Sequence, residues 1–201
     1  MPKHTPHPDR RIIAPENGKI VNGYLMTGII TSDFQIRTRW GWMGFENAWW
    51  NKDNWQELLY PNVCVDVDHN NWTASGHILA IASHTTIEKK RKQADWREPR
   101  PMDYVLATIY APVGSYACRN ITSQLKKSGR IGISIEHGGR KPNRTIGPFV
   151  TVTDRPWNKD AWIIWINNNE YIYPDHIKRL PNEIRELAHE QYCLVRGIHK
   201  I

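Results

Sequence analysis

Cysteine is scarce in this chain of 201 residues, and its three copies lie far apart. Cys64, Cys118 and Cys193 are odd in number and form no CxxC pair. Both features argue against a disulfide framework and against a zinc knuckle. The sequence therefore predicts a protein of a reducing compartment, with no structural metal and no cofactor suggested by its cysteines.

Long apolar segments are also missing. The longest purely apolar run covers residues 161–166, whereas a membrane-spanning helix needs about 20 apolar residues. The N-terminal residues, MPKHTPHPDRR, lack the apolar stretch of a secretory signal. We expect a soluble, unsecreted protein that does not contact membranes.

Basic residues are in excess, with a formal net charge of +7. A basic surface attracts polyanions in a salt-dependent manner. Part of the excess lies in residues 3–11 and part in 88–100 (EKKRKQADWREPR), which are typical of solvated segments. Contact with nucleic acid is therefore expected only as a nonspecific electrostatic effect.

The length supports one compact domain with its own core. We expect a basic, flexible N-terminal tail over residues 1–18 and a single domain over 19–201. Five of the ten tryptophans fall within residues 40–55. Core packing is the favoured interpretation of this cluster, and a peptide-binding groove is the alternative.

Short β-rich runs dominate the rest of the sequence and predict a mostly antiparallel β domain with peripheral helices. The helices are predicted from apolar periodicity and from end signals such as Gly129 after Lys126 and Lys127. Predicted strands cover 19–30, 34–42, 63–67, 77–83, 104–111, 130–136, 149–153 and 162–166, and predicted helices cover 45–59, 115–127 and about 181–195.

Three polar residues interrupt or follow apolar strands. Ser134 lies in RIGISIE, where the isoleucines share one face and Ser134 lies on the other; His69 follows VCVDVD, and Asp154 follows FVTVT. A serine hydroxyl becomes nucleophilic when a histidine takes its proton and a third polar group orients that histidine. Taken singly, each residue also fits turn chemistry or a polar position in a strand.

Two other readings of nearby residues are weaker. His137 is close to Ser134 in sequence, but three positions along a strand place it on the opposite face. Asp66 and Asp68 beside His69 suggest a metal site only faintly, because no second ligand cluster accompanies them.

The order and context of these segments resemble the prohead proteases of tailed bacteriophages, distant relatives of the herpesvirus assemblins. The resemblance covers roughly residues 20–167. It rests on VDVDHNNWTASGHI around His69, on ITSQLKKSGRIGISIEHGG with Ser134 in a G-x-S position, and on VTVTDRPWNKDAW with Asp154.

The resemblance implies a small, distorted antiparallel β-barrel of the herpesvirus-protease type and a serine endopeptidase with His69, Ser134 and Asp154 as its triad. After Ser134 this chain has IEHGGR, where the family often has Gly-Phe or Arg-Gly. Gly138, Gly139 and Arg140 are therefore only candidates for oxyanion donors. No cofactor and no metal are implied.

The implied substrates are scaffold and major capsid proteins, trimmed during prohead maturation in the host cytoplasm, inside the procapsid, together with the chain's own termini. A homo-oligomer is compatible with this role. The alternative is a noncatalytic β-barrel virion or nucleic-acid-binding protein, including an inactive protease homologue. That alternative predicts a continuous basic groove with exposed tryptophan rings.

Overall fold

The computed structural model describes residues 9–12, 23–32, 34–38, 41–45, 59, 64–70, 74–87, 101–135, 149–156, 158, 160–167, 169–170 and 180–198. The strands are β1 (Asp9–Ile12), β2 (Gly23–Ser32), β3 (Phe34–Thr38), β4 (Gly41–Phe45), β5 (Cys64–Val67), β6 (Gly76–Ile87), β7 (Pro101–Pro112), β8 (Gly132–Ile135), β9 (Phe149–Thr153), β10 (Ile163–Ile166) and β11 (Asn169–Glu170). The helices are α1 (Tyr116–Ser128) and α3 (Asn182–Ile198).

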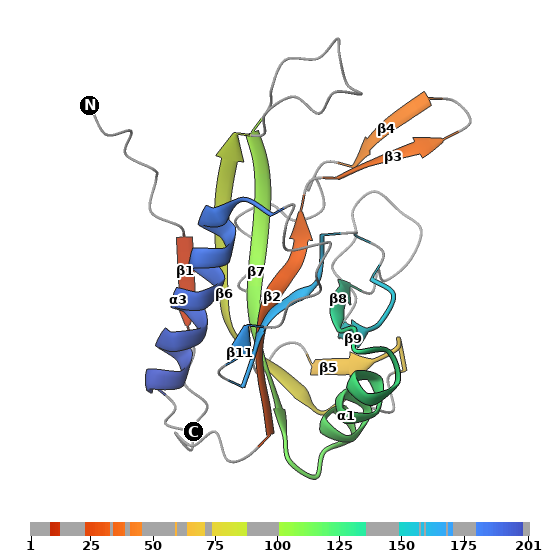
Figure 1. Cartoon of the computed structure of the whole chain (residues 1–201), viewed down its shortest axis with the longest axis vertical. Helices are drawn as coiled ribbons and strands as arrows, with labels where there is room; N and C mark the ends of the chain where they lie inside the picture. Colours follow the sequence, from red (N-terminus) through yellow and green to blue (C-terminus); the bar gives the residue numbers. More distant parts are fainter. Residues whose placement is uncertain are drawn as a thin grey trace.

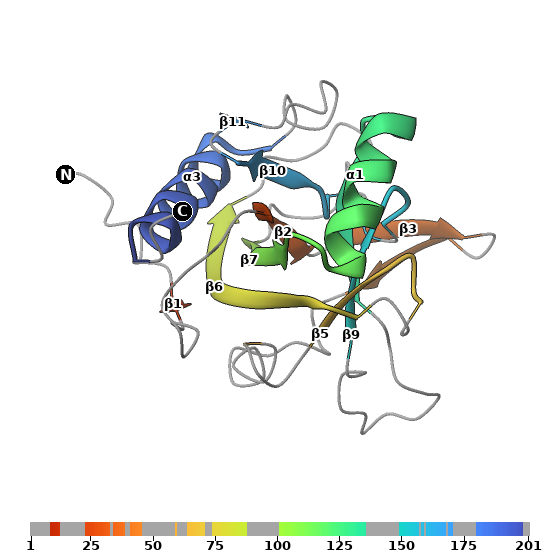
Figure 2. The same cartoon turned by 90° about the horizontal axis from the view of Figure 1, so that it is seen from below.

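Seven strands form a nearly closed barrel in the order β10-β2-β7-β6-β5-β9-β8 (Figures 1 and 2). The two ends of this path meet through backbone hydrogen bonds, from Ile133 N to Ala161 O at 2.8 Å and from Ile163 N to Ile131 O at 3.0 Å. Among the described pairings of this sheet, β5 with β9 is parallel and the others are antiparallel. The predicted class, mostly β with peripheral helices, is confirmed.

Strand alternation places one set of apolar side chains inside the barrel. The buried interior includes Met26 and Ile30 of β2, Val65 of β5, Ile133 of β8 and Val152 of β9. Because successive side chains of a strand point to opposite faces, the residues between these positions lie on the outer wall. The interior is therefore a hydrophobic core, and any chemistry must lie outside it.

Helix α1 packs against the interior residues at the end of the barrel near β5 and β7 (Figure 1). Its first turn is capped by the Ser115 side chain, which accepts from Cys118 N at 3.1 Å. The helix ends at Gly129, whose φ of 63° closes the last turn. Buried Ala117 and Ile121 join the core, which explains the apolar stripe of the sequence.

Helix α3 covers the outer wall of β2, β7, β6 and β10, on the side of the barrel away from α1 (Figure 2). Its buried stripe includes Ile184, Leu187 and Tyr192. Buried Gln191 lies in this contact, and its side-chain nitrogen donates to Thr108 Oγ1 at 2.9 Å. Neither helix in the described part of the chain is long and apolar enough to cross a membrane.

Three local expectations need correction or fall outside the described part of the chain. Asp9–Ile12 were expected in a flexible tail but form β1, which pairs with β6. The backbone partners come from β6, and no pattern in the sequence of this segment predicts them. Residues 34–42, expected as one strand, give the hairpin of β3 and β4. Phe45 ends β4 instead of starting a helix, and the rest of 45–59, except Leu59, lies outside the described residues.

Candidate functional site

The outer wall of β5, β9 and β8 carries a group of buried polar side chains. Asp66 lies between buried Val65 and Val67, and Thr151 lies between buried Val150 and Val152. Because the valines belong to the interior, Asp66 and Thr151 lie on the outer side. Ser134 follows the interior residue Ile133 and shares that side, as the isoleucine pattern predicted.

These three residues form one lateral row across the wall. Thr151 is the register partner of Ser134 in the antiparallel pair β8 and β9, and of Asp66 in the parallel pair β5 and β9. Side chains of directly paired residues lie about 4.5–5.5 Å apart at their Cβ atoms. Asp66 and Thr151 have no exposed surface, and Ser134 keeps 6 %. The row therefore holds a hydroxyl, a second hydroxyl and a carboxyl side by side in a largely buried setting.

His69 lies in a tight turn directly after β5, as predicted. Asp68 and His69 both have positive φ, 52° and 56°, which non-glycine residues adopt rarely and which fits a functional turn. The turn is fixed by hydrogen bonds from Asp68 N to Val152 O and from Asn70 N to Val67 O, both 3.1 Å. His69 is exposed at this position.

The turn is joined to the polar row by one side chain. The backbone N–H of His69 donates to Thr151 Oγ1 at 2.9 Å. Because the Thr151 side chain lies on the outer wall, this bond holds the turn against the wall at the same residue that pairs with Ser134. In the described residues, no hydrogen bond joins the His69 ring to Ser134.

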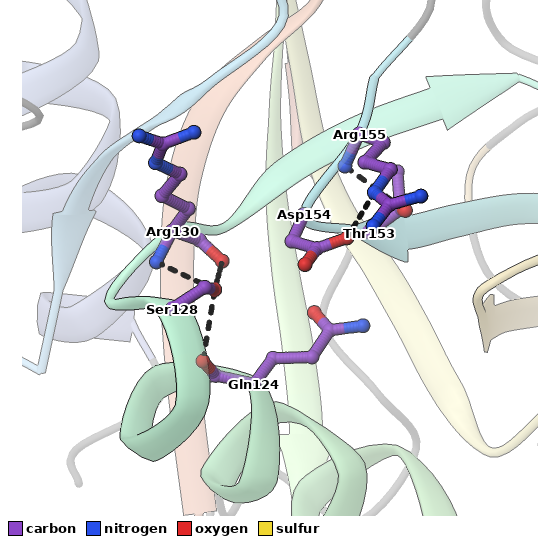
Figure 3. A network of polar contacts seen from close by, with 6 residues as sticks. All are labelled: Gln124, Ser128, Arg130, Thr153, Asp154 and Arg155. Atoms are coloured by element: carbon purple, nitrogen blue, oxygen red, sulfur yellow. Dashed lines mark hydrogen bonds and ion pairs between the residues drawn. The ribbon is translucent and has the colours of Figure 1, made fainter.

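Asp154 follows β9 as His69 follows β5. Since these two strands run parallel, both residues leave the sheet at the same edge. The Asp154 carboxylate contacts exposed Arg155, with 3.8 Å between Oδ1 and Nε. Figure 3 shows the Gln124 side chain of α1 pointing toward Asp154. The structure thus places the Asp154 carboxylate on the side of α1, and no hydrogen bond among the described residues connects it to His69.

Gln124 is an unusual residue for this position. Its side chain is 8 % exposed, and neither its amide nitrogen nor its amide oxygen has a hydrogen-bond partner among the described residues. A buried amide without partners is costly. The Asp154 carboxylate is the polar group toward which it points (Figure 3).

Local hydrogen bonds shape the turn that leads from α1 into β8. Ser128 Oγ donates to Gln124 O at 3.1 Å, and Arg130 N donates back to Ser128 Oγ at 3.2 Å (Figure 3). Arg155 N likewise donates to Thr153 Oγ1 at 3.2 Å, just after β9. These bonds fix the ends of the two strands that carry Ser134 and Thr151.

A second lateral row lies two residues from Asp66 on the same wall. Cys64 pairs with His77, and His77 pairs with Tyr110. Cys64 is a half-buried free thiol. Burial lowers the pKa of the His77 imidazole from its ordinary value, because desolvation disfavours the charged ring. This side of the wall therefore favours neutral imidazole at His77.

Three candidate residues fall outside the described part of the chain, namely Gly138, Gly139 and Arg140. In the described residues, no three or more His, Cys, Asp or Glu side chains gather closely enough to hold a metal ion.

Sequence reasoning missed Thr151 and the place of Asp66 in the row. A signal for both was present, because each is a polar residue between two valines of a short strand. The pairing of β5 with β9, which brings them together, is long-range and parallel. Neither alternation nor spacing within one segment specifies such a partner.

Comparison of the chain with protein-family models, with curated proteins and with solved structures gives no match.

Proposed function

We propose that the chain is a serine endopeptidase that trims scaffold and capsid-protein extensions during viral prohead maturation, with Ser134 as nucleophile and His69 as base. One observation carries the proposal: Thr151 pairs with Ser134 and also accepts the backbone hydrogen bond of His69. The predicted nucleophile and the predicted base, which are 65 residues apart in sequence, are thus both neighbours of one side chain.

The proposed chemistry is acyl transfer. Ser134 Oγ attacks a peptide carbonyl while the His69 imidazole takes the hydroxyl proton, and the protonated imidazole then returns that proton to the leaving amine. In the second half, a water molecule attacks the acyl-enzyme carbonyl while the His69 imidazole takes its proton, and the imidazole then gives that proton to Ser134 Oγ as the acid product leaves. Thr151 acts as a positioning residue, since it holds the backbone of the His69 turn beside the Ser134 strand.

Asp154 is the sequence-based candidate for the third triad member, and a structural role at the α1 side is the alternative. Asp154 and His69 follow parallel strands and lie at the same edge of the sheet, which favours the triad role. The contact of Asp154 with Arg155 and the approach of Gln124 favour a structural role at the α1 side. The two interpretations predict different effects of Asp154→Asn on the rate of trimming.

The noncatalytic alternative requires exposed tryptophan rings along a basic groove. The side chains of the tryptophan cluster in residues 40–55, which suggested this alternative, lie outside the described residues. Among the described tryptophans, Trp162 and Trp165 are partly exposed, and Trp165 is stacked on His189. The following experiment separates the two functions.

The test is co-expression of the protein with the scaffold and major capsid proteins of its own virus, followed by intact-mass analysis. Ser134→Ala should leave both proteins untrimmed. Ser83→Ala is the matched control, because Ser83 is likewise a strand serine that is 7 % exposed, and it should leave trimming intact. Equal masses in wild type and Ser134→Ala, with the shell assembled, would favour the noncatalytic barrel.

A further inference from the structure

The exposed face of α1 is basic. Every charged residue of this helix is a base, namely Arg119, Lys126 and Lys127, and all three are exposed. With Tyr116 they occupy positions i, i+3, i+10 and i+11, which share one side of an α-helix. We call these four residues the basic stripe.

Part of the basic stripe is held in place before any partner binds. The Arg119 guanidinium lies over the Tyr116 ring, 4.6 Å from its centre. Its Nη1 also donates to Gly114 O at 2.7 Å. This end of the stripe therefore loses little side-chain freedom on association.

The exposed face of α3 is acidic. Glu183, Glu186, Glu190 and Leu194 are exposed and occupy positions i, i+3, i+7 and i+11, again on one side of the helix. We call these four residues the acidic stripe. The basic residues of α3, Arg185 and Arg196, lie on other sides of the helix by the same periodicity.

Large exposed apolar side chains occur at these two places. Of the described residues, Val113, Tyr116 and Leu194 are the large hydrophobics with high exposure, at 61 %, 58 % and 42 %. Two belong to the stripes, and Val113 lies in the turn just before α1. Each stripe thus joins charges of one sign to an apolar side chain at one end.

The stripes match when the helices run antiparallel. At a rise of about 1.5 Å per residue, Lys126 and Lys127 lie about 15–16 Å beyond Tyr116, and Glu183 lies about 16 Å before Leu194. Setting Tyr116 against Leu194 brings Arg119 beside Glu190 and the lysines beside Glu183. The antiparallel arrangement also opposes the two helix dipoles, which is favourable.

The two stripes belong to opposite sides of one molecule. Figures 1 and 2 show α1 and α3 on different sides of the barrel, and α3 packs on β2, β6, β7 and β10. A match between them therefore needs two copies of the chain.

We propose that the basic stripe of one copy docks antiparallel on the acidic stripe of a second copy and builds a head-to-tail assembly. Such a contact is heterologous, because each copy keeps one unused stripe, so association continues until a ring closes or a chain extends. The proposal does not depend on protease chemistry.

The test measures the association of the full chain by sedimentation velocity over a range of about 1 to 200 µM. Wild type should form species larger than dimers as concentration rises, and should return toward monomer in about 0.5 M salt, which screens exposed charges. Lys126→Glu with Lys127→Glu should raise the dissociation constant at least about tenfold, and so should Glu183→Lys with Glu186→Lys.

Mixing the two reversed variants gives the sharper result. Within each variant both stripes carry a net charge of the same sign, so self-association is weakened, but across the variants every contact joins opposite signs. An equimolar mixture should therefore assemble again, which a variant that had simply unfolded could not do. Circular dichroism of each variant should match wild type.

Arg196→Glu is the matched control, since this exposed residue of α3 lies off the acidic stripe, and it should associate as wild type does. The proposal is overturned if wild type stays monomeric across the range, or if the mixture of reversed variants associates no better than either variant alone.

Discussion

The backbone amide of His69 donates a hydrogen bond to the side-chain oxygen of Thr151, 2.9 Å away. His69 lies in the turn after β5, whereas Thr151 lies in the middle of β9 as the register partner of Ser134. One threonine hydroxyl therefore determines where a strained, left-handed turn lies relative to a strand serine. If Ser134 and His69 act together, Thr151 is the residue whose loss should separate them.

Thr151→Val keeps the side-chain shape but removes the oxygen that accepts from His69 N. We expect slower trimming of the scaffold and faster hydrogen exchange at the His69 amide, with a stability loss of about 1 kcal/mol for the hydrogen bond. Thr151→Ser restores the acceptor and should recover most of the trimming rate. Equal trimming by the valine and serine variants would show that Thr151 does not position His69.

Asp154→Asn separates an orienting role from a structural one. Replacing the orienting Asp of a serine triad by Asn lowers kcat by about 10⁴, whereas we expect a loss below about tenfold here. The reason is that the Asp154 carboxylate contacts Arg155 and faces Gln124 on the α1 side. A collapse of trimming in a variant that still folds would restore Asp154 to the triad.

Gly132→Ala tests the closure of the barrel beside the site. A Cβ at this position would lie 2.6 Å from Ala161 O and 2.6 Å from Pro156 Cγ, so β8 or the facing chain must shift. We expect the free energy of unfolding to fall by about 1–3 kcal/mol in urea titrations.

Gly197→Ala is the control for that substitution, because nothing lies within 4 Å of the Cβ it would add. It should leave stability unchanged or raise it by up to about 1 kcal/mol, since alanine favours the helix. Equal stabilities for the two variants would contradict the close approach at Gly132.

His77 should make stability depend on pH. Burial lowers the pKa of this imidazole below its ordinary value of 6.5, so the folded chain binds the proton less readily than the unfolded chain. The stability that neutral His77 contributes is complete above pH 6.5 and is lost as the pH falls from 6.5 through the lowered pKa. Urea unfolding at a series of pH values should show a smaller loss of stability below pH 6.5 in His77→Gln than in wild type. An unchanged pH dependence would show that His77 is not the group responsible.

Local patterns predicted much of the fold. The alternation of isoleucine and serine in β8 correctly placed Ser134 opposite the core, and the end signals of α1 matched its observed cap at Gly129. These features are determined by residues that are close in sequence. Hydrophobic periodicity and helix-end signals therefore predict them directly.

The missed features depend on distant partners. Asp9–Ile12 have no strand pattern and pair because β6 offers an open edge. The hydrogen bonds from Ile133 N to Ala161 O and from Ile163 N to Ile131 O close the barrel across segments that no local rule joins. The same limit applies to the site. Polar residues in or after apolar strands, together with the family resemblance, suggested His69 and Ser134. The pairing of β9 with both β5 and β8, which makes Thr151 their shared neighbour, is visible only in three dimensions.

Chemical labelling of the reactive serine tests the proposed nucleophile most directly. Assembled particles that contain the protein are treated with a fluorophosphonate, and peptide mass spectrometry locates the adduct. We expect a phosphonyl adduct on Ser134 that disappears in His69→Gln and persists in Ser83→Ala. No adduct on Ser134 in wild-type particles, or an equal adduct in the His69→Gln variant, would contradict the proposal.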